Sequence, residues 1–189
     1  KRPQYSPFYE MIEGQEMDLS FTQPETQKDL EDYSYYVAST VGLMLLPLIA
    51  KHPKKLKEDA IALGKAMQIT NILRDIGEDL ENNRLYLPKN VMEKFGYTRD
   101  MLERHEISKK FIALWEYEAQ IAEAYYEQSL NLLDNLNKEA RKPLYLSLIF
   151  YKEILEVVRE NSYDCFTKRA IVGKRRKMRL LKRAEQTIK

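Results

Sequence analysis

Apolar residues recur every three or four positions along most of the chain, which is the spacing of helices that bury one face. Phe111, Leu114, Trp115 and Ala122 follow this spacing closely. Strand-like alternation with Asn-Gly or Asp-Gly turns does not appear. The sequence therefore predicts an all-α protein. Prolines, glycines and capping residues place the expected helices at residues 6–13, 25–46, 54–81, 88–96, 98 onwards, 108–136, 137–161 and 173 onwards.

No repeat, low-complexity segment or linker separates these helices, so we expect residues 1–189 to form one domain, a single helical bundle. The 189 residues, 44% of them apolar, suffice for a sizeable core. A net charge of +2 gives no overall field that would attract nucleic acid. The longest apolar run, residues 41–50, is too short to span a bilayer. No heptad run predicts assembly, which favours a monomer.

Cysteine and histidine contribute little candidate chemistry. The single cysteine, Cys165, excludes an internal disulfide framework and fits a cytoplasmic protein. We interpret it as a buried or half-buried thiol, because nothing in the sequence marks it as a nucleophile. His52 and His105 have no metal-ligand spacing, either with each other or with Cys165, and are predicted to lie on the surface or in loops.

Four polar side chains recur at about one-turn spacing within the helix predicted at residues 54–81. Gln68, Asn71, Asp75 and Asp79 would lie along one stripe of that helix. Two carboxylates one turn apart can bind a hard cation such as Mg²⁺ and leave its other positions to water and phosphate oxygens. Arg74 lies beside them, and a planar guanidinium suits phosphate recognition. The stripe predicts a site that holds a diphosphate.

The alternative interpretation of this stripe is an ordinary solvated helix face, on which pairs of aspartates are common. Ile69, Ile72 and Ile76 place an apolar stripe next to the acidic one, so the helix is expected to be at least half-buried. A carboxamide in line with both acids, as Asn71 is, would also be unusual on a face that only contacts water. These flanking residues favour the metal site.

Several motifs carry a resemblance to a known family. NILRDIGED at residues 71–79, followed by NRLYLP at 83–88, resembles the second aspartate-rich motif of the squalene/phytoene synthase family. DYSYYVASTVG at residues 32–42 is similar to the tyrosine-rich helix of that family, and FYKEIL at 150–155 and GKRRK at 173–177 also fit. The resemblance covers most of the chain, from Gly14 to Met178, and is closest to bacterial dehydrosqualene synthases. It implies the all-α fold of class I terpenoid synthases.

The resemblance also implies a role for each candidate residue. Aromatic ring faces attract a carbocation, and the family places tyrosines around its isoprenoid cavity, although half-buried structural tyrosines are the alternative in a chain with 13 of them. The residues implied to be catalytic are Asp75, Asp79, Tyr33 and Tyr151, with Asn71, Asp75 and Asp79 as metal ligands. The residues implied to bind substrate are Gln68, Asn71, Arg74, Tyr86 and Arg175.

The implied activity is the head-to-head condensation of two prenyl diphosphates, with farnesyl diphosphate favoured. The reaction passes through a cyclopropylcarbinyl diphosphate to a linear C30 or C40 polyene of squalene or carotenoid biosynthesis. The implied cofactor is Mg²⁺, and NADPH would be used only if the product is squalene. Family members are longer and carry a first D-x-x-x-D motif near their N-terminus, for which this chain has no counterpart. We therefore expect the C-terminal two-thirds of such an enzyme, without its N-terminal helices and inactive alone.

Two other function classes stay open at this stage. Another isoprenoid synthase would also use aspartate-rich helices, but the NRLYLP continuation argues against it. A non-catalytic assembly or binding protein would not need Asn71, Asp75 and Asp79 together, although the missing first motif favours it. The expected partners are prenyl diphosphates, with no nucleic acid. The basic run at residues 168–183 is either a solvated tail or a surface for diphosphate or anionic lipid, so peripheral membrane contact is also expected.

Overall fold

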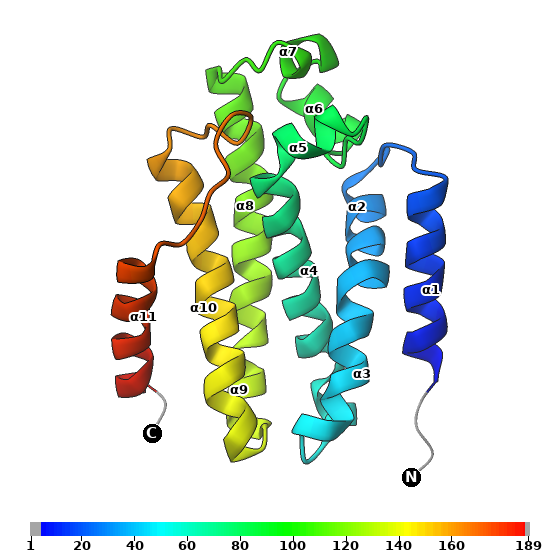
Figure 1. The fold of residues 1–189 in the computed structure, drawn as a ribbon. Helices are drawn as coiled ribbons and strands as arrows, with labels where there is room; N and C mark the ends of the chain where they lie inside the picture. Colours follow the sequence, from blue (N-terminus) through cyan, green and yellow to red (C-terminus); the bar gives the residue numbers. More distant parts are fainter. Residues whose placement is uncertain (1–4, 188–189) are drawn as a thin grey trace.

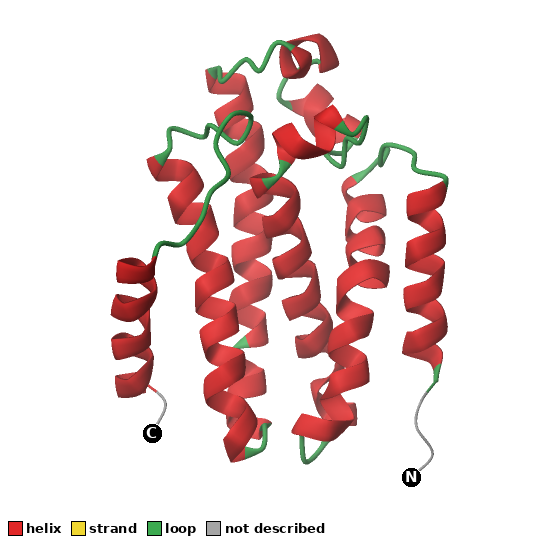
Figure 2. Ribbon diagram, viewed as in Figure 1, coloured by secondary structure: helices red, strands yellow, loops and turns green. Residues whose placement is uncertain are grey.

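The computed structural model describes residues 5–187 as a bundle of helices joined by short loops (Figures 1 and 2). The elements in chain order are α1 (Ser6–Leu19), α2 (Gln27–Ser34), η1 (Tyr35–Ser39), α3 (Thr40–Ile49), η2 (Pro53–Leu56), α4 (Lys57–Arg74), α5 (Ile76–Glu81), α6 (Lys89–Lys94), α7 (Arg99–Glu103), α8 (Lys109–Ser129), α9 (Asn131–Asn135), α10 (Lys138–Glu160) and α11 (Lys174–Thr187). The all-α prediction is confirmed. The predicted domain 1–189 stays a prediction, and its residues 1–4 and 188–189 lie outside the described part.

Helices α4 and α8 form the centre of the bundle. Ile69 and Leu73 of α4 and Phe111, Leu114 and Trp115 of α8 are each 0% exposed. Burial of one such side chain contributes about 2–3 kcal/mol. Helices α3 and α10 flank α4, while α11 packs against α10 at one edge of the bundle and α1 packs against α3 at the other (Figure 1). None of the helices within residues 5–187 combines the length and the apolarity that crossing a membrane requires.

Capping residues behave as the sequence predicts. The side chains of Thr98 and Ser108 accept hydrogen bonds from the third backbone N–H of α7 and of α8. Cys165 is buried, as expected, and burial raises the pKa of its thiol to about 12. His52 and His105 lie outside the helices on the exposed surface, which confirms the prediction for both.

The first predicted helix was placed too short, because Gly14 does not end it. Helix α1 continues to Leu19, and Gly14 packs against η1, where an added Cβ would lie 3.0 Å from the Tyr36 carbonyl carbon. A glycine inside a helix thus allows two backbones to approach closely. The helix predicted at residues 25–46 contains the π-turn η1, and the one predicted at 108–136 is divided at Leu130 into α8 and α9.

The predicted continuous helix over residues 54–81 is also wrong, because it is interrupted at Asp75 between α4 and α5. The Leu73 carbonyl accepts a hydrogen bond from the Trp115 indole N–H at 3.2 Å. The Gly77 N–H, four residues on, donates to the Cys165 carbonyl at 3.1 Å. Side-chain and loop partners thus replace the bond that would join Gly77 to Leu73, which is a recognised cause of helix kinks.

A buried carboxyl links α2 to α8. Glu118 of α8 is 0% exposed and its Oε2 accepts a hydrogen bond from Gln27 Nε2 at 3.1 Å. Gln27 Oε1 and Glu118 Oε1 are both buried without a hydrogen-bond partner. Burial, and next the charge of Glu31, raise the pKa of Glu118 to about 7, against the lowering effects of Gln27 and Lys94. A proton on the carboxyl would remove the charge that burial penalises.

We expect Glu118→Gln to remove a pH dependence of stability. The folded-state pKa is raised, so the carboxyl stabilises the fold fully below its unfolded pKa of about 4.5, and this contribution is lost as pH rises to about 7. Measured by urea unfolding, the free energy of unfolding of the wild type should fall by about 2–3 kcal/mol more than that of Glu118→Gln between these two pH values. Glu127→Gln, on the exposed side of α8, should retain the wild-type dependence. An unchanged slope in Glu118→Gln would contradict the prediction.

Candidate diphosphate and metal site

The acidic motif lies where α4 meets α5, at the top of the bundle in Figure 1. Asn71 is in the last turn of α4, and its Oδ1 atom is buried without a hydrogen-bond partner. Asp79 is in α5, beyond the kink, so the three residues do not form the straight stripe that a continuous helix would give. Burial, then the charges of Asp75 and Glu78, raise the pKa of Asp79 to about 7. The site therefore concentrates negative charge that a cation would neutralise.

The donor set fits Mg²⁺ bound together with a substrate better than a closed protein site. Among residues 5–187, no group of three or more His, Cys, Asp and Glu side chains is arranged to hold a metal ion. Asn71, Asp75 and Asp79 instead offer one amide oxygen and two carboxylates. Mg²⁺ typically binds through one or two carboxylates and keeps positions for water and phosphate oxygens. The orphaned oxygen of Asn71 supports this assignment, because a metal would give that oxygen a partner.

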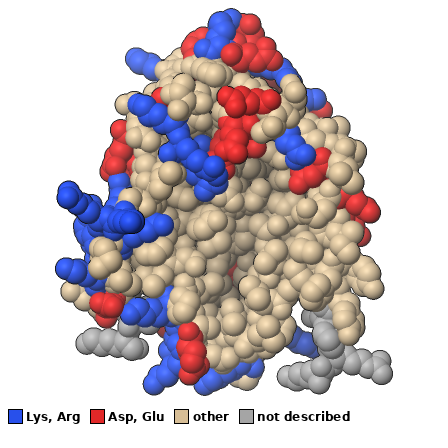
Figure 3. All heavy atoms as spheres, viewed as in Figure 1, with Lys and Arg blue, Asp and Glu red and all other residues tan. Residues whose placement is uncertain are grey.

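Two arginines surround Asp75. Arg74 Nε donates to Asp75 Oδ1 at 2.7 Å, and Arg74 Nη2 bonds Oδ2 of the same carboxylate. This hydrogen bond is the main cause that raises the pKa of Arg74. Arg169, from the loop before α11, lies 3.9 Å from Asp75 Oδ1 and 3.4 Å from Glu78 Oε2. Acidic and basic side chains accordingly lie next to one another at the upper end of a largely uncharged face (Figure 3).

A cavity of about 190 Å³ opens beside these arginines. Arg74 and Arg169 line one part of it, and Phe150 and Tyr151 of α10 line another. Lys177 of α11 also lines the cavity, with its Nζ 5.8 Å from the centre of the Phe150 ring. Cationic groups and aromatic rings therefore share one small space, which suits a diphosphate attached to an apolar chain.

Tyr33 and Tyr86 lie together at a second cavity, of about 600 Å³, between α2 and the loop before it. Their rings stack with centres 5.1 Å apart. Asp18 Oδ1 accepts hydrogen bonds from Tyr33 at 3.0 Å and from Arg84 at 2.9 Å, and a longer one from Tyr86 at 3.4 Å. Burial is the main cause that raises the pKa of Tyr33 well above its usual range, so its hydroxyl stays protonated and donates.

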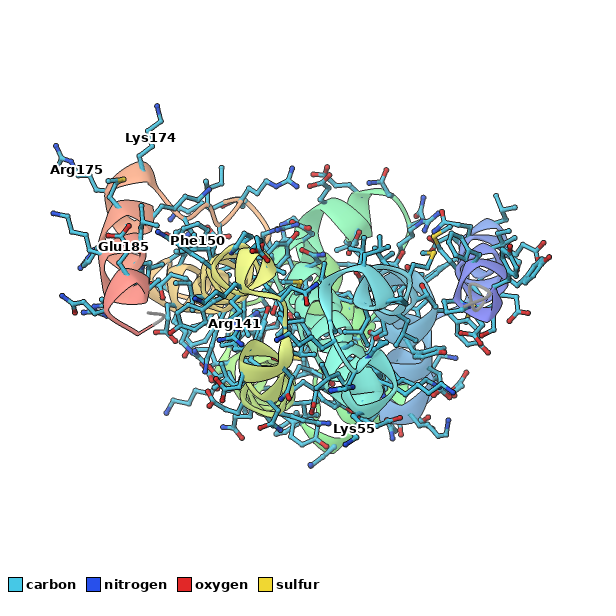
Figure 4. The ribbon with its side chains drawn as sticks, turned by 90° about the horizontal axis from the view of Figure 1, so that it is seen from below. Lys55, Arg141, Phe150, Lys174, Arg175 and Glu185 are labelled. Carbon is cyan, nitrogen blue, oxygen red and sulfur yellow. The ribbon has the colours of Figure 1, made fainter. Side chains whose placement is uncertain are left out.

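The structure brings together some of the predicted site residues and separates others. Asn71, Arg74, Asp75 and Asp79 meet at the junction of α4 and α5, and Gln68 precedes them on α4. Tyr151 joins them through the smaller cavity, whereas Tyr33 and Tyr86 line the larger one. Arg175 is not brought to the site, because its side chain is exposed and points away from the bundle (Figure 4).

Sequence reasoning missed three residues of the site. Asp18 has no acidic partner four residues away, so its spacing gives no signal, yet it contacts Arg84, 66 positions later. Arg169 and Lys177 belong to the basic run, in which the sequence does not distinguish the cations that reach the cavity. Their positions depend on the path of the loop over α5, for which the sequence carried no signal.

Comparison with known proteins identifies the family. The sequence model described as squalene/phytoene synthase matches residues 2–178. The chain belongs to the squalene/phytoene synthase family. Its fold is accordingly the all-α fold of that family, as the resemblance implied.

Named relatives of this family member are similar over nearly all of the chain. The 15-cis-phytoene synthase of Synechococcus elongatus is 40% identical over 184 residues, covering 91% of the chain and 60% of the relative. The 4,4'-diapophytoene synthase of Staphylococcus haemolyticus is 37% identical, covering 98% of the chain and 65% of the relative. The crystal structure of a dehydrosqualene synthase in complex with ligand has a TM-score of 0.92 and 43% identity, covering 96% of the chain and 64% of that protein. The chain thus spans less than two-thirds of these relatives.

Proposed function

We propose that the protein is a prenyltransferase that condenses two prenyl diphosphates head to head into a linear polyene of carotenoid or squalene-type biosynthesis. The observation that carries this proposal is the cluster of Asn71, Asp75 and Asp79 beside Arg74 and the aromatic cavity. The similarity to synthases of phytoene, diapophytoene and dehydrosqualene supports the same reaction class. We further propose that it works as a cytoplasmic monomer.

In the proposed reaction, the protein stabilises the negative charge of a departing diphosphate. Bound Mg²⁺, held by Asn71, Asp75 and Asp79, would neutralise diphosphate oxygens and improve the leaving group. Arg74 and Arg169 already point at one carboxylate, so they are oriented before an anion arrives. Lys177 would add a further positive charge at the mouth of the cavity.

The apolar and aromatic residues would protect the allylic cation that ionisation leaves. Tyr151 and Phe150 present ring faces in the smaller cavity, and ring faces attract positive charge. The double bond of the second substrate would attack this cation to give a tertiary cation, and loss of a proton would close the ring of the cyclopropylcarbinyl diphosphate. Its ionisation, rearrangement and a second proton loss would give the polyene. We propose Tyr33 and Tyr86 as a second aromatic wall, held in place by Asp18. Gln68 would line the pocket between them.

We propose farnesyl diphosphate as the substrate and a C30 polyene as the product. The solved dehydrosqualene synthase, whose name indicates a C30 product, is 43% identical to the chain. A final reduction by NADPH would be needed only for squalene itself. A longer C20 substrate remains the competing choice, because phytoene synthases are also close relatives.

Calorimetric binding of farnesyl thiodiphosphate, which resists ionisation, tests the proposed site. Binding to the chain is expected to be about tenfold or more tighter with Mg²⁺ than without it. Geranylgeranyl thiodiphosphate, measured in parallel, tests the chain length. Metal-independent binding, or no binding, would contradict the proposal and favour a non-catalytic relative.

Arg169→Gln should weaken this binding about tenfold, because it removes a charge-assisted hydrogen-bond donor. Arg99→Gln is a matched control, since the two arginine side chains are 59% and 58% exposed and each pairs with a carboxylate. Equal effects of the two substitutions would show that Arg169 acts only through net charge.

A further inference from the structure

The outward face of α11 carries positive charge that no carboxylate within the described part of the chain neutralises. Arg175, Arg179 and Lys182 recur at spacings of three and four residues and are exposed, so they share one side of the helix. Lys174 and Arg175 point outward from the bundle at the start of α11 (Figure 4). The helix contains one acid, Glu185, which is bound to Lys142 of α10 at 3.1 Å. Among residues 5–187, no carboxylate pairs with Arg175, Arg179 or Lys182, so the repulsion between these cations is not offset there.

Some exposed cations elsewhere on the described part of the molecule are paired with carboxylates, although the exposed lysines of η2 are not among them. Lys28 pairs with Asp32, and Arg99 pairs with Glu103, one turn away on the same helix. In the first turn of α11, Arg176 turns inward and pairs with Glu153 and Glu160 of α10. The basic surface appears in Figure 3 as Lys and Arg atoms gathered at the edge where α11 lies.

Apolar side chains are exposed on this face and in the segment just before α11. Met178 lies between Arg175 and Lys182 on the same face and is 55% exposed, and Ile171, just before α11, is 68% exposed. The apolar face of α11 is already occupied, because Leu180 packs against the core and Ala184 is 1% exposed. A partner must therefore accept cations together with a shallow apolar contact. An anionic lipid surface does so, whereas nucleic acid would favour aromatic side chains for stacking, which α11 lacks.

We propose that the outward face of α11, formed by Lys174, Arg175, Met178, Arg179 and Lys182, docks the protein on membranes that contain anionic lipids. The cations contact headgroup phosphates, and Met178 and Ile171 enter the headgroup layer. The charge complementarity of this face carries the inference. The prenyl substrates and polyene product give it a use, because they partition into lipid, and this added support rests on the proposed function.

Sedimentation with lipid vesicles tests the docking face without substrate, so its outcome is independent of the proposed reaction. The chain should bind vesicles that contain about 30% phosphatidylserine and not neutral phosphatidylcholine vesicles, at about 0.1 M salt. The double variant Arg175→Glu/Lys182→Glu should bind the anionic vesicles at least about tenfold more weakly than the wild type. The matched control is Lys54→Glu/Lys55→Glu, because both lysines are exposed on η2 and the change in net charge is the same.

Three results would overturn the proposal. The first is the absence of wild-type binding to anionic vesicles. The second is an equal loss of binding in the η2 control, which would show that only net charge matters. The third is tighter binding to DNA or RNA than to vesicles at the same salt. Circular dichroism of both double variants establishes that they fold, and both replace exposed side chains.

Discussion

Replacing Asp79 by asparagine is expected to abolish Mg²⁺-dependent binding of the thiodiphosphate while the fold becomes slightly more stable. Asp79 is a proposed metal ligand, and a neutral amide donates less charge to a cation. In the protein without metal, burial of the same carboxylate, and next the charges of Asp75 and Glu78, raise its pKa to about 7. Removing this buried charge should raise the free energy of unfolding by about 1 kcal/mol. Replacement of a functional residue often stabilises the fold in this way.

Two measurements separate this expectation from simple damage to the fold. Calorimetry should detect no enhancement of thiodiphosphate binding by Mg²⁺ in Asp79→Asn, and thermal unfolding should show an unchanged or raised midpoint. Glu81→Gln is the matched control, because it makes the same charge change at an exposed position of α5. It should retain the Mg²⁺ effect. Retained metal dependence in Asp79→Asn would remove Asp79 from the metal site.

The helices could be predicted from sequence because their signals are local. Apolar periodicity and the capping residues Thr98 and Ser108 act within one or two turns, and the structure confirms them. The break at Asp75 could not be predicted, because its causes come from distant segments. Trp115 reaches Leu73 across 42 positions, and the Gly77 N–H finds its partner in Cys165. Propensity within α4 and α5 gives no sign of either contact.

Some residues of the candidate site could also be predicted from local sequence, and others could not. Asn71, Arg74, Asp75 and Asp79 are neighbours in sequence, so their spacing was sufficient to group them. Asp18 joins Tyr33 and Tyr86 only because the end of α1 meets α2 and the segment after α5 in the folded chain, which no spacing rule predicts. Among the clustered cations at the C-terminal end, orientation decides which ones reach the cavity, and orientation follows from how α11 packs on α10.

Gly77→Ala is expected to be among the most destabilising single substitutions and to weaken diphosphate binding as well. A Cβ at this position would lie 2.5 Å from the Phe166 carbonyl oxygen and 2.6 Å from its Cα, distances that real Cβ atoms essentially never show. The obstructing atoms are backbone, so the loop that contains Cys165 and Phe166 must move. The expected cost is about 3–4 kcal/mol, at the upper end for an overpacked site.

The loop that must move also places Arg169 beside Asp75, so Gly77→Ala should displace Arg169 although no site residue is replaced. Thiodiphosphate affinity is expected to fall about tenfold in the fraction that remains folded, as when one charge-assisted contact is lost.

Gly173→Ala is the matched control at the other end of this loop, where an added Cβ would meet nothing within 4 Å. It should leave binding unchanged and the free energy of unfolding equal or slightly higher. Urea unfolding measures the stability of both variants, and calorimetry measures their thiodiphosphate affinity. Wild-type stability in Gly77→Ala would show that the loop yields easily, and lost stability with intact affinity would show that Arg169 is positioned independently of Gly77.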